Sequence, residues 1–192
     1  MRRIARALGT GTALWLALGS AHAGPDGPSL VAGQSEISFV SRQMGVPVAG
    51  NFRSFDAQVS FDPANPQKGH FLIGVDVDSV VLPTDDAMKE VVGPVWFDAA
   101  HFARATFQSS AVRALERGRY EVAGRLSIKG HAQDLLVPVL LEQTGGLTVA
   151  SGSLVVRRLG FAIGEGEWAD TSMVADEVQI RFRLVLTGIA PI

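Results

Sequence analysis

Residues that could carry out chemistry are few in this chain, and their spacing does not bring them together. Three of its four histidines, His70, His101 and His131, lie beyond residue 23 in three different segments, and the chain has no cysteine. Catalytic and metal-binding sets usually show short fixed spacings such as HExxH or GxSxG, and none of these patterns occurs. We therefore expect the three histidines on the surface or in turns, no catalytic residue, no metal site and no cofactor.

Two acidic pairs and one glycine-rich segment have structural explanations that we favour over chemical ones. Asp76 and Asp78 lie on the polar side of a predicted strand, whereas Asp85 and Asp86 lie in the first turn of a predicted helix, where acids stabilise the helix dipole. The segment 160–168 (GFAIGEGEW) has no helix and no lysine after it, so a nucleotide-binding loop is not expected. A bend or a close approach of the backbone explains its glycines better.

The elements that must position any site are mostly strands. Apolar and polar residues alternate with a period of two, which is typical of a strand with one buried face. This pattern predicts strands in seven segments: 36–39, 56–61, 71–77, 120–128, 135–141, 147–155 and 177–186. The file that we expect to be buried in 177–186 is Val178, Ile180, Phe182, Leu184 and Leu186. In 147–155, which follows a predicted Gly145-Gly146 turn, it is Leu147, Val149, Ser151, Ser153 and Val155.

One short helix interrupts the strands. Thr84 is a suitable N-cap for a helix that starts at Asp85, and Gly93-Pro94 would end it. The predicted order is about three strands, this helix and about five more strands in one domain. Such a chain can close into an antiparallel barrel or stack as a sandwich, and the pattern alone does not separate the two. An eight-stranded barrel is wide enough to hold one small ligand.

The first 23 residues read as a cleaved secretory signal. Arg2, Arg3 and Arg6 precede a short apolar run, and Ala21-His22-Ala23 places small residues where a signal peptidase would cut, after Ala23. The alternative is an uncleaved anchor, but the run is shorter than the roughly 20 residues that span a bilayer. We expect a periplasmic protein with a leader over 24–34, a folded domain over 35–188 and a tail over 189–192.

Composition excludes several classes of partner. The 17 basic residues include the three arginines of the predicted signal, which leaves 14 against 19 acidic residues, a net charge of −5. An acidic chain without basic clusters is not expected to bind nucleic acid or anionic lipid surfaces. No segment after residue 23 is long and apolar enough to anchor the chain in a membrane.

Four stretches together resemble one family. They are SEISFVSRQMGVPVAGNFRSFDAQVSFDP (35–63), GPVWFDAAHFARATFQSSAV (93–112), YEVAGRLSIKG (120–130) and LGFAIGEGEWADTSMVADEVQIRFRLVL (159–186). They are similar to motifs of the YceI-like periplasmic lipid- or polyisoprenoid-binding proteins, in the same order. The resemblance implies an all-β fold, a single antiparallel eight-stranded lipocalin-like barrel with one short helix between early and later strands. It also implies an internal apolar tunnel, isoprenoid, quinone or fatty-acyl ligands, and homodimers as an oligomeric state.

The chain departs from that family in three places. Gln43 stands where many members carry a histidine, and Asp85-Asp86 stands where many carry an Arg-Asp pair. Ala162 replaces the second glycine of the family's FGIG turn. If the first two positions hold a ligand head group, the head-group preference of this protein differs from that of its relatives.

Our leading hypothesis is a non-enzymatic periplasmic carrier of a long-chain amphiphile. We expect lipid contacts from Phe39, Met44, Phe52, Phe71, Phe107, Tyr120, Leu126, Phe161 and Trp168. Arg42 and Gln43 are the expected head-group residues. The same aromatic residues could instead fill a solid core, since periodicity does not distinguish a core from a cavity.

The sequence alone leaves three other functions open. The first is a quinone-linked accessory whose partner is a membrane cytochrome. The second is an enzyme that uses the barrel as a vessel for lipid chemistry, which a buried carboxylate or histidine with a shifted pKa would support. The third is a ligand-free envelope-stress or interaction module.

Overall fold

A computed structural model describes residues 27–116 and 118–192. The predicted signal peptide and its cut after Ala23 lie outside the described residues. The described part of the predicted leader joins the fold, because β1 (Ser29–Leu30) pairs with the last strand and the 3-10 helix η1 (Ala32–Gln34) follows it.

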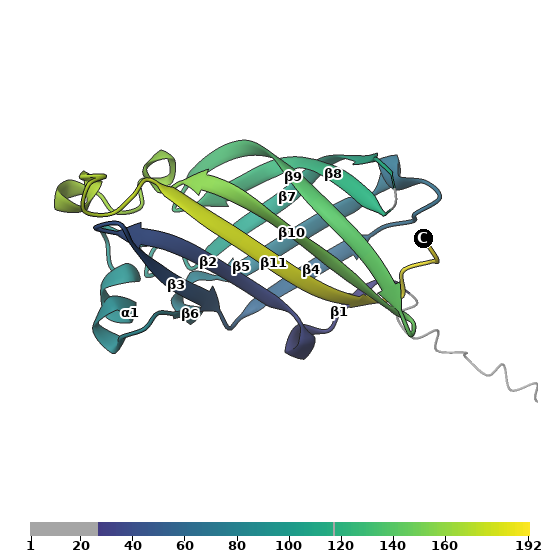
Figure 1. The fold of residues 1–192 in the computed structure, drawn as a ribbon, viewed down its shortest axis with the longest axis horizontal. Helices are drawn as coiled ribbons and strands as arrows, with labels where there is room; N and C mark the ends of the chain where they lie inside the picture. Colours follow the sequence, from purple (N-terminus) through teal and green to yellow (C-terminus); the bar gives the residue numbers. More distant parts are fainter. Residues whose placement is uncertain (1–26, 117) are drawn as a thin grey trace, which may run out of the picture.

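The described residues form one strongly curled antiparallel sheet around a single interior (Figure 1). Its strands are β2 (Glu36–Gln43), β3 (Val46–Phe52), β4 (Phe55–Ser60), β5 (His70–Asp76), β6 (Val80–Val81), β7 (Arg104–Ala114), β8 (Arg119–Ile128), β9 (His131–Thr144), β10 (Leu147–Arg157) and β11 (Glu177–Thr187). Their order in the sheet is β4-β5-β7-β8-β9-β10-β11-β2-β3-β6, and β1 is added beside β11.

The predicted all-β, antiparallel class is confirmed, but the count of eight strands is not. The sheet has eleven strands within the described residues, two of which, β1 and β6, are only two residues long. The hydrogen-bonded order begins at β4 and ends at β6, so the sheet curls without forming one continuous ring of ladders. The sequence pattern missed β3 because Pro47 and Gly50 interrupt its alternation, and such residues are tolerated near a sheet edge.

Tight two-residue turns set the register of three hairpins. The predicted Gly145-Gly146 turn between β9 and β10 is confirmed, with φ of 60° and 82°. Lys129-Gly130 and Met44-Gly45 have the same pair of positive φ angles. Two successive positive φ angles are typical of type I′ turns, whose twist matches that of the strands.

The predicted helix is confirmed as α1 (Asp85–Val91). The Thr84 side chain accepts a hydrogen bond of 3.2 Å from the backbone N–H of Ala87, and Val92 is the C-cap, just before Gly93. Shorter 3-10 turns are η2 (Pro66–Lys68), η3 (Val77–Ser79), η4 (Arg158–Phe161) and η5 (Gly166–Ala169). Among the described helices, none has the length and apolar character to cross a membrane.

The inward-facing residues of β11 are as predicted. For β10 the prediction is wrong by one residue, so it names the outward-facing set. Thr148, Ala150 and Val156 are buried, whereas Val155 of the predicted inward file is 55% exposed. Both files of β10 carry apolar residues, so its alternation did not say which face is buried. A shift of one residue exchanges the two faces of a strand completely.

Candidate functional site

The curled sheet encloses an apolar cavity of about 280 Å³. This volume is close to the lower end of the roughly 300–1,000 Å³ typical of small-molecule sites. Side chains from β2, β3, β4, β5 and β7 to β11 line it, together with Val91 of α1 and the segment that follows α1. Nearly all of these side chains are apolar, so the site can remove hydrocarbon from water.

Glycine–phenylalanine pairs explain why the interior is open although it is rich in aromatic residues. Phe39 lies opposite Gly50, and a Cβ atom added to Gly50 would come within 2.4 Å of the Phe39 ring. Phe182 lies opposite Gly152, with a corresponding distance of 2.5 Å. Since these glycines have no side chain, each ring lies against the neighbouring strand and projects less into the cavity.

Gly124 makes the third such approach. A Cβ atom there would lie 2.4 Å from the ring of Phe107 and 2.6 Å from the backbone carbonyl oxygen of Gln108. Phe39, Phe107 and Phe182 all line the cavity. The three pairs therefore control how much of the interior the aromatic rings fill.

Tyr120 and Trp96 are the two aromatic residues with a polar group in the described lining of the cavity, and Tyr120 lies on β8. Its ring packs edge-on against Phe61 with centroids 5.3 Å apart, and Phe61 in turn contacts Phe71. Burial raises the pKa of the Tyr120 hydroxyl above its ordinary value of 10, so the group stays neutral at physiological pH. It can offer a hydrogen bond there without a charge.

The structure brings most of the predicted lipid-contact residues together. Seven line the cavity: Phe39, Phe52, Phe71, Phe107, Tyr120, Leu126 and Phe161. The other two, Met44 and Trp168, are not part of the lining. Contact of these seven residues with a lipid stays a prediction.

Met44 lies outside the cavity because it forms the β2–β3 turn. Its φ is 47° and it is 66% exposed, so the alternation of β2 does not extend to it. Trp168 belongs to η5 and packs on the ring of Trp96, with centroids 5.5 Å apart, rather than on the cavity itself. For both residues the predicted direct contact with the cavity is corrected.

The two predicted head-group residues lie on the same exposed hairpin, at the end of β2. The Arg42 side chain donates to the carbonyl of Gly45 at 3.2 Å, and Gln43 forms an isolated bridge with Val174. Neither lines the cavity. They lie beside the segment 158–176, which we call the β10–β11 loop.

The β10–β11 loop lies at the same end of the molecule as α1, far from the C-terminus (Figure 1). A single side chain holds it together: Arg158 is only 3% exposed and lines the cavity. Its guanidinium group donates five hydrogen bonds of 2.6 to 3.1 Å, all to backbone carbonyls of the loop. These are the carbonyls of Ile163, Gly164, Trp168, Val174 and Ala175.

Burial lowers the pKa of Arg158 below its ordinary value, and the charge of Asp176 partly offsets this effect. A guanidinium group has five N–H donors, so every donor of Arg158 is used within the loop. The predicted close approach in 160–168 is confirmed here, because a Cβ atom on Gly164 would lie 2.4 Å from Nη1 of Arg158. The glycine lets the loop close around the charge.

Lys129 and Val95 also fix the β10–β11 loop to the rest of the fold. Lys129, in the β8–β9 turn, donates to the carbonyl of Ala162 at 2.7 Å and to the carboxylate of Glu165 at 2.8 Å. The carbonyl of Val95, just after α1, accepts from the backbone N–H groups of Gly164 and Glu165 at 2.8 and 2.9 Å. One end of the interior is thus covered by segments joined through polar contacts.

Trp96, in the segment after α1, has a hydrogen-bond donor without an acceptor among the described residues. The donor is its buried Nε1, and the residue lines the cavity. A buried donor left without a partner costs about 1–3 kcal/mol, so native structures nearly always provide one.

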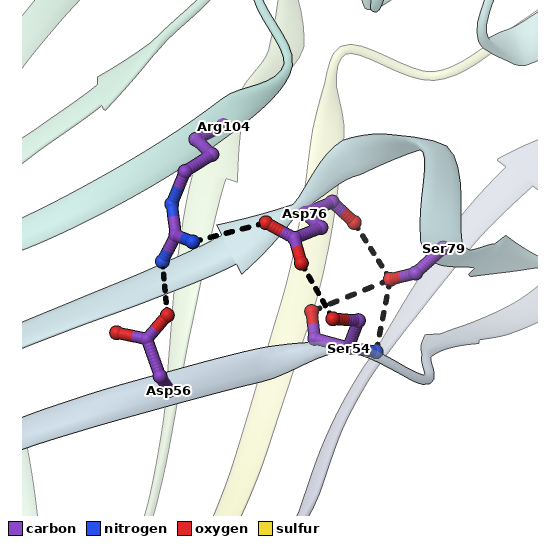
Figure 2. Close-up of polar contacts among 5 residues, drawn as sticks. All are labelled: Ser54, Asp56, Asp76, Ser79 and Arg104. Carbon is purple, nitrogen blue, oxygen red and sulfur yellow. Dashed lines mark hydrogen bonds and ion pairs between the residues drawn. The ribbon is translucent and has the colours of Figure 1, made fainter.

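Asp76, expected on the polar side of its strand, takes part in a structural network on the outer surface. Figure 2 shows the Arg104 guanidinium between Asp56 of β4 and Asp76 of β5, with Nη1 3.1 Å from the Asp76 carboxylate. Asp76 also accepts a 2.5 Å hydrogen bond from the Ser54 hydroxyl, and the Ser79 hydroxyl donates to its backbone carbonyl at 2.6 Å. The network joins the start of β4 to the end of β5.

The histidines and acidic residues of the described part of the chain do not gather into a metal-binding group. Within it, no group of three or more His, Asp or Glu side chains could hold a metal ion. The predicted surface positions of His70, His101 and His131 are confirmed, and His101 contacts Asp98 at 2.8 Å. Among the described residues, no His, Asp or Glu lines the cavity.

Trp96, Phe97 and Arg158 are among the lining residues that sequence reasoning did not place in the site. Trp96 and Phe97 follow the Gly93-Pro94 stop in a segment without alternation, yet both line the cavity. Phe97 packs edge-on against Phe52, with centroids 6.2 Å apart. Arg158 follows Arg157 at the end of β10, and no local signal separates the buried arginine from the exposed one.

Fold and site together define a class: small antiparallel β proteins whose curled sheet encloses an apolar ligand-sized cavity. The sequence profile of the YceI-like domain matches residues 29–186, which is most of the chain. The chain belongs to the YceI-like family.

Known relatives agree with this assignment. An UPF0312 protein of Vibrio cholerae is 28% identical over 104 residues, or 54% of this chain and 55% of the relative. One of Yersinia pestis is 30% identical over 107 residues, or 55% and 53% of the two chains. The chain thus spans about half the length of the curated relatives that it matches.

Solved structures extend the likeness to the whole fold. BcnA of Burkholderia cenocepacia superposes with a TM-score of 0.79 at 44% identity, covering 81% of this chain and 98% of BcnA. A polyisoprenoid-binding domain from Saccharophagus degradans superposes with a TM-score of 0.66 at 17% identity, covering 85% and 98%. The second likeness shows the fold alone.

Proposed function

We propose that this protein is a non-enzymatic carrier that holds one long-chain amphiphile in its apolar cavity. The observation that carries the proposal is the cavity itself, whose lining is contributed by nearly every strand of the sheet. Hydrocarbon removed from water gains roughly 25 cal/mol per Å² of buried surface. A pre-formed cavity gives that gain with little ordering cost in the protein.

The chemistry of the lining supports binding rather than catalysis. It offers no carboxylate or imidazole for proton transfer within the described residues, and its tyrosine hydroxyl is held neutral. The open interior also supports a ligand-binding role over that of a solid interaction module. Isoprenoids, quinone tails and fatty-acyl chains all present the unbranched or methyl-branched hydrocarbon that this lining would accept.

The family assignment supports the same proposal. A relative of the same fold is described as a polyisoprenoid-binding domain, and we extend that ligand class to this chain. The basic, apolar and small-residue regions before Gly24 support export to the periplasm, where a chain lipid between two membranes would need a carrier.

The experiment compares two alanine-to-phenylalanine variants of delipidated protein. Ala150 is buried on the inner face of β10 and lines the cavity, whereas Ala49 is exposed on β3. Ala150→Phe places a ring in the cavity, and Ala49→Phe adds the same ring outside it. Binding is measured as displacement of a fluorescent fatty acid by farnesol.

We expect saturable binding to the natural chain and to Ala49→Phe, with affinity reduced at least tenfold in Ala150→Phe. Circular dichroism and thermal unfolding check that both variants are folded, because overpacking a core can cost about 1–3 kcal/mol. Absence of saturable binding to the natural chain, or equal affinity of both folded variants, would contradict the proposal.

A further inference from the structure

The wall of the cavity is not paired along its whole length, and one break lies between β9 and β10. The paired residues of these two strands run from Leu147↔Thr144 to Ser151↔Leu140 and end there. Both strands continue, β9 as 131–139 and β10 as 152–157, and both stay paired on their other sides, with β8 and with β11. In Figure 1 the ribbon of β9 arches away from that of β10 after their shared turn. We call residues 131–139 and 152–157 the unpaired stretch.

Pro138 and Gly152 lie where the pairing stops. Pro138 has no N–H group to give to a ladder, and proline in a strand is confined to edges and irregular places. A Cβ atom on Gly152 would clash with the carbonyl oxygen of Pro138, so the two backbones still touch at this point. Further along β9, the Asp134 side chain turns toward β8 and pairs with Arg125 at 2.9 Å. The break therefore follows from the sequence of the two strands.

Apolar side chains lie on both faces of the unpaired stretch. On the outside, Leu136 of β9 is 57% exposed and Val155 of β10 is 55% exposed, which places them among the most exposed large apolar residues that the structure describes. On the inside, Val137, Leu154 and Val156 line the cavity. Hydrocarbon thus continues from the outer surface to the cavity at this place in the wall.

The other break in the order of the sheet, between β4 and β6, is closed by hydrogen bonds. The backbone N–H of Arg53 donates to the Ser79 carbonyl at 3.1 Å, and the Ser54 N–H donates to the Ser79 hydroxyl at 3.1 Å. Figure 2 shows how Ser54 and Ser79 also meet at Asp76. Opening the wall there, or along a paired ladder, breaks backbone hydrogen bonds, whereas the unpaired stretch opens by movement of apolar side chains.

We propose that the unpaired stretch is the entrance of the cavity, through which a chain amphiphile passes sideways between β9 and β10. At about 3.3 Å per residue, residues 152–157 extend roughly 20 Å, so a chain can enter along its length and not only end-on. Leu136 and Val155 contact the hydrocarbon first, and Val137 and Leu154 contact it inside the wall. This inference rests on the proposed function and adds the route by which its ligand is exchanged.

The test joins the two strands across the unpaired stretch, in a chain that has no cysteine of its own. Leu136→Cys/Val155→Cys puts one thiol on each side, at positions that would face each other if the pairing continued. The matched control is Glu142→Cys/Val149→Cys, where the two residues are already paired on the same face. Each pair is joined by oxidation, or by a short bis-maleimide where oxidation is incomplete. The mass of the intact protein confirms the bridge, and circular dichroism confirms the fold.

We expect the bridge between positions 136 and 155 to slow both uptake and release of a fluorescent fatty acid by about tenfold or more in stopped-flow measurements. The dissociation constant should stay unchanged, because a closed entrance raises the barrier in both directions and leaves the free and bound states as they are. The control bridge should change neither rate, since it joins residues that do not separate.

Unchanged rates in the bridged protein would overturn the inference and leave the carrier role intact, because the ligand would then enter elsewhere. Equal slowing by the two bridges would also overturn it, since the effect would then come from stiffening of the wall as a whole. So would a pair of thiols at 136 and 155 that neither reagent joins in the folded variant, because the two sides of one entrance must lie within reach of a short linker. If the natural chain takes up no amphiphile, the proposed function fails and the inference fails with it.

Discussion

At the scale of single residues, Arg158 explains how a long loop with only two short 3-10 turns closes one end of the interior. A buried cation is costly unless its donors are satisfied. Here five carbonyls of one loop satisfy them, and the packed ring of Trp96 lies beside the charge. The side chain therefore organises the β10–β11 loop and leaves head-group recognition to other residues.

Replacing Arg158 should destabilise the fold far more than replacing its neighbour. Arg158→Met leaves five carbonyls without their donor and should lower the free energy of unfolding by about 3 kcal/mol. Arg158→Lys should recover little of this, since an ammonium group has three donors and no planar fork. Urea denaturation measures both.

Arg157→Met is the matched control, because Arg157 is exposed at the preceding position. Its effect should stay within about 0.5 kcal/mol. Equal losses for the two arginines would contradict the role assigned to Arg158.

Ala162 offers a stabilising change in the same loop. Its φ of 53° is a left-handed conformation that costs a residue with a Cβ atom roughly 1–2 kcal/mol. Ala162→Gly should therefore stabilise the protein by about 0.5–1 kcal/mol, after the greater chain entropy of glycine is subtracted. Ala169→Gly, at a position without a positive φ, should be neutral or destabilising in the same thermal unfolding assay.

At the scale of elements, glycines on the inner and outer faces of the sheet lie in different surroundings. Inside, Gly124 makes room for the Phe107 ring and the Gln108 carbonyl. Outside, a Cβ atom on Gly74 would meet the guanidinium group of Arg104, the end of a flexible and half-exposed side chain. The inner glycine is constrained by backbone and by a packed ring, and the outer one only by a side chain that can move.

This difference predicts the outcome of one substitution at each position. Gly124→Ala should lower the free energy of unfolding by about 1–3 kcal/mol and weaken binding of farnesol, since Phe107 must move into the cavity. Gly74→Ala should cost less than about 1 kcal/mol, the usual worth of an exposed ion pair, and leave binding unchanged. Chemical denaturation and probe displacement report the two effects separately, and a reversed order would contradict the account.

The elements also show what the sequence can and cannot predict. The helix from Asp85 and the inward file of β11 followed from local signals, because a cap and a clean alternation leave one choice. For β10 both files are apolar, so its orientation depends on neighbouring strands and not on its own residues. Seven of the nine expected contact residues line the cavity, and Met44 and Trp168 fail because turns, not strands, position them.

At the scale of the whole molecule, an open interior is a source of instability that a ligand would remove. Cavities lose the packing contacts that a solid core provides. A ligand that binds only the folded state stabilises it in proportion to its concentration, by about 2.7 kcal/mol at one hundred times the dissociation constant.

Delipidated protein should therefore unfold at a temperature that rises steadily with added farnesol. Ala150→Phe, whose cavity is filled by its own ring, should show little or no rise over the same range. Differential scanning calorimetry measures both curves, and a parallel rise in the two proteins would show that the stabilisation arises outside the cavity.

The most direct test of the central claim is native mass spectrometry of the protein purified gently from the organism that makes it. The account predicts a population with one chain lipid per protein, which disappears on organic extraction. A spectrum with only the bare chain, together with a delipidated protein that takes up no amphiphile, would contradict the claim.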